Sequence, residues 1–184
     1  MSDPKSIQAL KRLISRAPSS EELRDKRAKL FSEKNDWTLA MTAASLLEST
    51  LEIAIEKNFR PLNASERRDL FDGTSPLTTF SAKIKMTYAL DIIGRMTRDD
   101  MDCIRDIRNA FAHTRVDLSF DQEYVVRVCN KIKLPDNLNL PKEIKFNNQS
   151  QPRIRYLLTT NCFTLTLDDL NSHGQSDFAG QLRF

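Results

Sequence analysis

The sequence is poor in turn-forming residues, with 4 glycines and 7 prolines among 184 residues. Folds made of many short strands need frequent turns, so this scarcity argues against an all-β architecture. The 40% share of hydrophobic residues argues against a disordered chain. We therefore expect an all-α protein with a substantial buried core.

Signatures of metal and cofactor sites are also missing. The 3 cysteines (Cys103, Cys129 and Cys162) are far apart, and no pair has the spacing of metal ligands. There is no glycine-rich phosphate loop, no HExxH pattern and no GxSxG pattern. We expect no cofactor and no metal site, and the scattered cysteines favour a reduced, cytoplasmic protein.

Long apolar runs are absent as well. No run approaches the roughly 18 residues of a membrane-spanning helix, and the N-terminus has no apolar signal segment. We therefore expect no membrane contact. Charge is unevenly placed, because basic residues outnumber acidic ones in residues 1–35. The expected organisation is a basic helical arm (1–35), a core helical domain (36–132), and a loop, helix and flexible tail (133–184).

A multi-helix bundle centred on a long helix over residues 36–59 is the expected fold. Apolar residues recur there at helical spacing around most of the circumference, and Asp36 is the expected N-cap. The one polar line on this helix consists of Glu48, Glu52 and Glu56, and Arg60 continues it. We interpret that line as solvated surface with an ion pair between neighbouring turns.

Two shorter helices, 79–93 and 97–113, are expected to pack as an antiparallel pair. Gly94 is expected just beyond the end of the first, and Thr97 is the expected N-cap of the second, with Asp100 as its capping-box acid. A further helix is expected at about 121–132, followed by a loop over 133–152. Residues 154–170 fit both a strand and a helix, and Pro152 and the helical context favour a helix.

The chain has one group of residues that could perform chemistry, Arg108-Asn109 followed by His113. In one interpretation Arg108 binds a phosphate and His113 transfers a proton at a ribose hydroxyl, as in a ribonuclease. In the other, His113 caps the helix C-terminus while Arg108 and Asn109 hold the next loop. A regular helix places Arg108 and His113 about 140° apart. They would meet only beyond the helix end or across a two-fold axis.

The residues around this group resemble the mannitol operon repressor family. The matching blocks are SPLTTFSAKIKMTYALDII at 75–93 and DCIRDIRNAFAH at 102–113, with Asp91 where the family often has glycine. The likeness covers about residues 36–132. It implies a helical fold and a role in transcription regulation as a repressor. It also implies contacts with a protein partner or a ligand, without a recognised DNA-binding module.

The Arg-Asn-x-x-x-His element is also similar to the signature of HEPN domains, which are helical dimers that include metal-independent ribonucleases. That second resemblance implies a homodimer, contact with RNA, and catalytic roles for Arg108, Asn109 and His113. The favoured prediction is a regulator that binds a protein. The alternative is a HEPN-like endoribonuclease of toxin or defence type.

Overall fold

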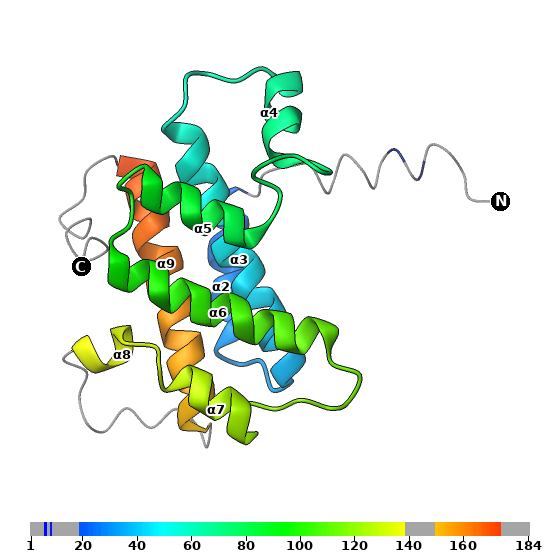
Figure 1. The fold of residues 1–184 in the computed structure, drawn as a ribbon, viewed down its shortest axis with the longest axis vertical. Coiled ribbons are helices and arrows are strands. Elements are labelled where there is room, and N and C mark those ends of the chain that lie inside the picture. The colour runs from blue at the N-terminus through cyan, green and yellow to red at the C-terminus, as the bar shows by residue number, and fades with distance from the viewer. Residues whose placement is uncertain (1–5, 7, 9–18, 139–149, 174–184) are drawn as a thin grey trace.

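The computed structural model describes residues 6, 8, 19–138 and 150–173, and this part of the chain is helical without any strand. The expected all-α bundle is therefore confirmed (Figure 1). In chain order the labelled helices are α2 (Ser20–Leu30), α3 (Asp36–Lys57), α4 (Ala64–Phe71), α5 (Phe80–Ala89), α6 (Arg95–His113), α7 (Glu123–Cys129), α8 (Leu134–Asn137) and α9 (Gln151–His173).

Helix α3 is the centre of the bundle, as expected from its apolar circumference. It packs against α2, α5, α6 and α9, and Figure 1 shows α5 and α6 crossing in front of α3 and α9. By length and composition α3 could cross a membrane, but much of it is buried inside the protein, as in the core helix of a soluble protein. Its fully buried side chains include Leu39, Ala40, Ala43, Ala44, Leu47, Leu51 and Ile55.

The start of α3 differs from the expectation by one residue. The N-cap is Asn35, whose side chain accepts a hydrogen bond from the Thr38 N–H at 2.8 Å. Asp36 is instead the first helical residue, and its carboxylate accepts the Phe120 N–H at 2.9 Å and pairs with Arg153 of α9. Asp36 therefore joins three segments of the chain.

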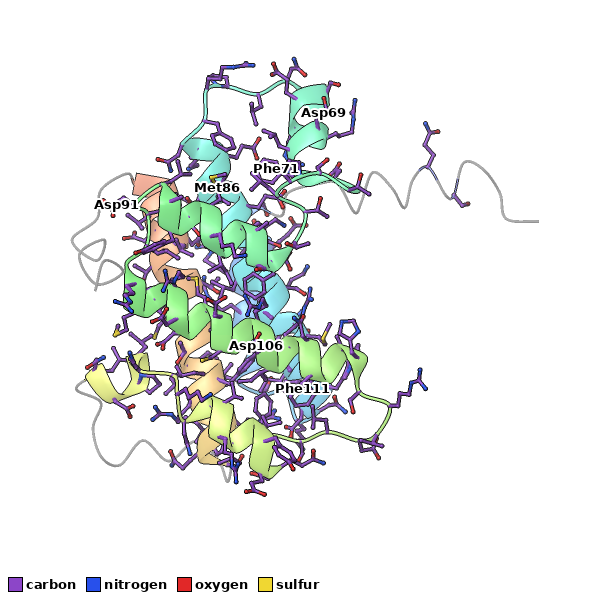
Figure 2. All side chains as sticks on the ribbon, in the orientation of Figure 1. Asp69, Phe71, Met86, Asp91, Asp106 and Phe111 are labelled. Carbon is purple, nitrogen blue, oxygen red and sulfur yellow. The ribbon has the colours of Figure 1, made fainter. Side chains whose placement is uncertain are left out.

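The turn between α5 and α6 is also arranged differently from the expectation. Helix α5 ends at Ala89 in a Schellman motif, in which the Ile92 N–H donates to the Thr87 carbonyl at 3.0 Å. Asp91 occupies the left-handed position of that motif, with φ of 55° (Figure 2). Gly94 is the N-cap of α6, and Thr97, predicted to cap that helix, is buried in its first turn. The two helices lie side by side and run in opposite directions, as predicted (Figure 1).

Two other helices begin with capping boxes. Ser19 and Glu22 form a capping box at α2, and Asn63 and Glu66 form one at α4. Leu23 of α2 is buried in the main core cluster. The division of the chain at residues 35 and 132 stays a prediction. The first half of the expected basic arm and the part of the expected tail beyond His173 fall almost entirely outside the described residues.

The segment that fitted both a strand and a helix is a helix, α9. Its Tyr156 is fully buried, and the phenol O–H donates to the Ala40 carbonyl of α3 at 2.8 Å. Helix α7 ends at Cys129, three residues earlier than expected, and single turns continue to Ile132. The short helix α8 was not predicted and lies in the expected loop, whose residues 139–149 are outside the described part.

Candidate functional site

Arg108 and Asn109 are neighbours on α6, and the Arg108 side chain reaches α3. One terminal nitrogen of Arg108 donates to the Asn109 side-chain oxygen at 3.1 Å, and the other donates to a Glu48 carboxylate oxygen at 3.3 Å. The Arg108 side chain is 27% exposed and that of Glu48 is 17% exposed. Arg108 is thus engaged by a half-buried carboxylate within its own chain.

Glu48 belongs to a larger set of alternating charges, which we call the charge ladder. Lys83 of α5 lies 3.3 Å from Glu48 and 2.8 Å from Glu52. Arg67 of α4 pairs with Glu52 and lies 3.2 Å from Glu56. The ladder consists of three carboxylates from α3 and three cations from α4, α5 and α6, namely Glu48, Glu52, Glu56, Arg67, Lys83 and Arg108.

The interpretation of the glutamate line as solvated surface is therefore wrong. Residues four apart share a helix face, and this face of α3 is covered by neighbouring helices, so the carboxylates meet cations. Lys83 is itself buried, which is tolerable because two carboxylates hold its ammonium group. Arg60 does not continue the line but pairs with Glu66 at 2.6 Å.

Sequence reasoning did not identify Lys83 and Arg67 as members of this site. A signal was available, because a regular line of carboxylates on an otherwise apolar helix needs cations from the elements that cover it. The partners could not be assigned from the sequence, since they lie 11 to 60 positions away along the chain.

His113 is the last residue of α6, and its side chain is exposed. Within the described residues, Arg108 bonds to Glu48 and Asn109 and makes no hydrogen bond or ion pair with His113. The helix C-terminus is secured by other groups. The Thr114 N–H donates to the Ala110 carbonyl at 3.0 Å, and the indole N–H of Trp37 donates to the Phe111 carbonyl at 3.1 Å.

Trp37 therefore links the start of α3 to the end of α6. Its indole ring is 53% exposed although its N–H is satisfied by the Phe111 carbonyl, one of the acceptors that a helix end leaves free. Trp37 is thus an anchor between these two helices. An exposed aromatic ring held in one orientation is also a frequent element of protein-binding surfaces.

Asp100, predicted to cap α6, joins distant segments instead. Its carboxylate is almost fully buried and accepts the backbone N–H groups of Lys133 and Leu134, each at 2.8 Å. Burial raises the pKa of this carboxyl, and the two N–H bonds oppose that rise. Asp100 thus holds the start of α8 against α6.

The acidic face of α6 is largely paired with arginines. Arg98 contacts Asp99 at 2.7 Å, and Arg105 contacts Asp102 and also Asp106, the latter at 2.7 Å (Asp106 is labelled in Figure 2). These pairs reduce the local negative charge that an approaching phosphate would meet.

The described residues contain no group of three or more His, Cys, Asp or Glu side chains that could hold a metal ion. The cysteine thiols are free, and burial raises the pKa of Cys129 to about 12. Neither observation adds a chemically active group to the charge ladder.

Comparison with known proteins gives one informative match, to a solved structure. No family model matches the chain, and no curated protein does. A chain in the X-ray structure of the MtlR-HPr complex from Escherichia coli has a TM-score of 0.55 and 20% identity, over 82% of this chain and 96% of that one. At this identity the likeness shows an MtlR-like fold.

Proposed function

We propose that this protein is a regulator that acts by binding another protein. The observation that supports this function is the likeness of its fold to a chain of the MtlR-HPr complex, a complex between two proteins. The expected role resembles that of a mannitol operon repressor and is carried out in the cytoplasm.

The internal use of the motif residues is consistent with this proposal. Arg108 is engaged by Glu48 and Asn109, so a phosphate would have to compete with a carboxylate already in place. The exposed Trp37 ring, held by the Phe111 carbonyl, offers a rigid aromatic contact of the kind that protein interfaces use.

The direct test uses HPr from Escherichia coli as the probe. Purified protein is titrated with purified HPr by calorimetry, and the mixture is sized by light scattering. A saturable complex of defined stoichiometry is expected. Trp37→Ala should weaken it if that ring lies in the interface, whereas Leu165→Ala, which alters an exposed apolar side chain on α9, is the matched control. Failure to bind HPr would reject this partner.

DNA binding provides a second check. The proposal expects the protein alone to bind DNA without sequence preference, and any weak attraction should vanish as salt is raised. Tight, sequence-specific binding of an operator by the purified protein would contradict action through protein contacts.

A HEPN-like ribonuclease is the second candidate function. The observation in its favour is that His113 is exposed at the end of α6, where a second copy of the chain could reach it. In that model two copies of Arg108 and His113 meet across a two-fold axis, and Asn109 orients Arg108. The basic residues of the N-terminal arm would attract RNA.

RNA cleavage in EDTA decides between the two functions. The wild type, His113→Ala and the control Arg115→Ala, which removes an exposed cation two residues away, are compared at equal folding and oligomer size. The ribonuclease requires a dimer and loss of cleavage in His113→Ala alone. Intact RNA with the wild type would reject this candidate.

A further inference from the structure

Helix α4 buries fewer of its side chains in the bundle than helix α2, which is also short. Of its eight residues only Phe71 is buried, whereas α2 buries both Leu23 and Leu30 in the main core cluster. Phe71 belongs to a second, separate cluster whose other buried members are Ile55 and Leu77. Figure 1 shows α4 at one end of the molecule, and Figure 2 shows Phe71 at the end of α4 nearer the bundle.

Among the described residues, the ion pairs that attach α4 to α3 are made by one side chain. Arg67 pairs with Glu52 and Glu56 of α3, and its side chain is 18% exposed. The rest of α4 is closed onto its own following loop, because the Leu77 N–H donates to the Leu70 carbonyl at 2.9 Å. Helix α4 and this loop can therefore move as one unit once Phe71, Leu77 and Arg67 leave their places.

The departure of Arg67 would change the balance of the charge ladder. Glu52 would lose one of its two cations and attract Lys83 more strongly, since Lys83 lies 2.8 Å from Glu52 and 3.3 Å from Glu48. Glu48 would then be left mainly to Arg108. The ladder thus provides a continuous set of contacts from α4 to α6.

We propose that α4 is a latch that opens while the rest of the bundle stays folded, and that the charge ladder couples its position to Arg108. Few buried apolar side chains and a single ionic attachment are what a locally opening segment requires. Coupling between two sites requires an element with two states whose balance each site can shift. In this proposal the element is α4, attached or detached, and the two sites are Arg67 and Arg108. The device does not depend on which partner the protein binds.

Opening is tested by amide hydrogen exchange of the full chain, read by mass spectrometry on peptides covering α4, α3 and α9. In the wild type, α4 should exchange faster and with a smaller denaturant dependence than α3 and α9. Arg67→Met keeps the apolar stem and removes the charge, and should speed exchange in α4 about three- to tenfold while α9 is unchanged.

Arg60→Met is the matched control, because Arg60 pairs with Glu66 at the exposed start of the same segment and lies outside the ladder. It should leave exchange in α4 within about twofold of the wild type. Common exchange of α4 and α9 through global unfolding in the wild type, or equal effects of Arg67→Met and Arg60→Met, would overturn the latch.

Coupling is tested at the other end of the ladder with Arg108→Met. Loss of this cation leaves Glu48 to hold Lys83 more tightly, which draws Lys83 away from Glu52 and strengthens the hold of Glu52 on Arg67. Exchange in α4 should therefore slow by about two- to threefold, and the effect should disappear in the Arg67→Met background. An unchanged α4 in Arg108→Met, with α9 as internal reference, would overturn the coupling.

Discussion

The guanidinium of Arg108 on α6 lies 3.3 Å from the carboxylate of Glu48 on α3, across a separation of 60 positions in the sequence. This contact ties a residue that sequence motifs mark as catalytic to the central helix of the bundle. A charge with a partner inside the chain is less available for a ligand, and its removal changes the stability of the fold as well as any function. Functional tests at Arg108 therefore need a parallel measurement of stability.

Lys83→Met tests the energetic weight of the charge ladder. Removing the buried ammonium group leaves Glu48 and Glu52 close together without their shared cation, so the free energy of unfolding should fall by about 2–4 kcal/mol. The control Lys85→Met alters an exposed lysine of the same helix and should change it by less than about 0.5 kcal/mol. Urea unfolding provides the measurement. Equal effects would mean that the ladder contributes little.

Leu47→Ala and Ile104→Ala test the packing of α3 against α6. Both side chains are fully buried in the main cluster, so each substitution leaves a cavity and should lower the free energy of unfolding by about 2–5 kcal/mol. The partly exposed Leu165 of α9 is the control, and Leu165→Ala should cost less than about 1 kcal/mol in the same assay. Similar values at all three positions would contradict the assigned core.

The helices and their apolar faces were predictable because they depend on local spacing. Leu47 and Ile104 share the three- and four-residue periods of their helices, and both are buried in the structure. Capping boxes are equally local, because the residues of those at Ser19 and Asn63 lie within one helical turn. At these positions the local sequence pattern and the burial in the structure agree, so the helices and their buried faces can be predicted from the sequence.

Polar residues used over long distances were not predictable in the same way. Asp100 lies where a capping-box acid is expected, but its carboxylate accepts hydrogen bonds from the backbone N–H groups of Lys133 and Leu134, more than thirty positions later. The glutamates of α3 were predicted to be solvent-exposed, because the neighbouring sequence does not contain the cations that pair with them. The roles of Asn109 and His113 depend on what binds the protein, which the residues of one chain do not specify.

Asp91 provides a prediction about backbone conformation. Its φ of 55° lies in the left-handed region, where a side chain is strained and glycine is not. Asp91→Gly should therefore be more stable than Asp91→Ala by about 1 kcal/mol in thermal or urea unfolding. Equal stability of the two variants would show that the turn adjusts without cost.

The final prediction concerns Asp100 and pH. Burial raises the pKa of its carboxyl, so between the ordinary aspartate value of about 3.9 and the raised value the folded protein binds more protons than the unfolded chain. This group's contribution to the free energy of unfolding is therefore complete below the ordinary pKa and declines as pH rises through that window.

Asp100→Asn cannot titrate, and its single side-chain oxygen must serve both backbone N–H groups of Lys133 and Leu134. The variant should be less stable than the wild type by about 1–3 kcal/mol, and the gap should be larger near pH 3.5 than at pH 7. Taking the difference cancels the other titrating groups, which both proteins share. Asp99→Asn at the neighbouring, half-exposed position should change stability by less than about 0.5 kcal/mol. A gap that widens as pH rises would mean that the two backbone N–H bonds outweigh burial and hold the carboxylate in its charged form.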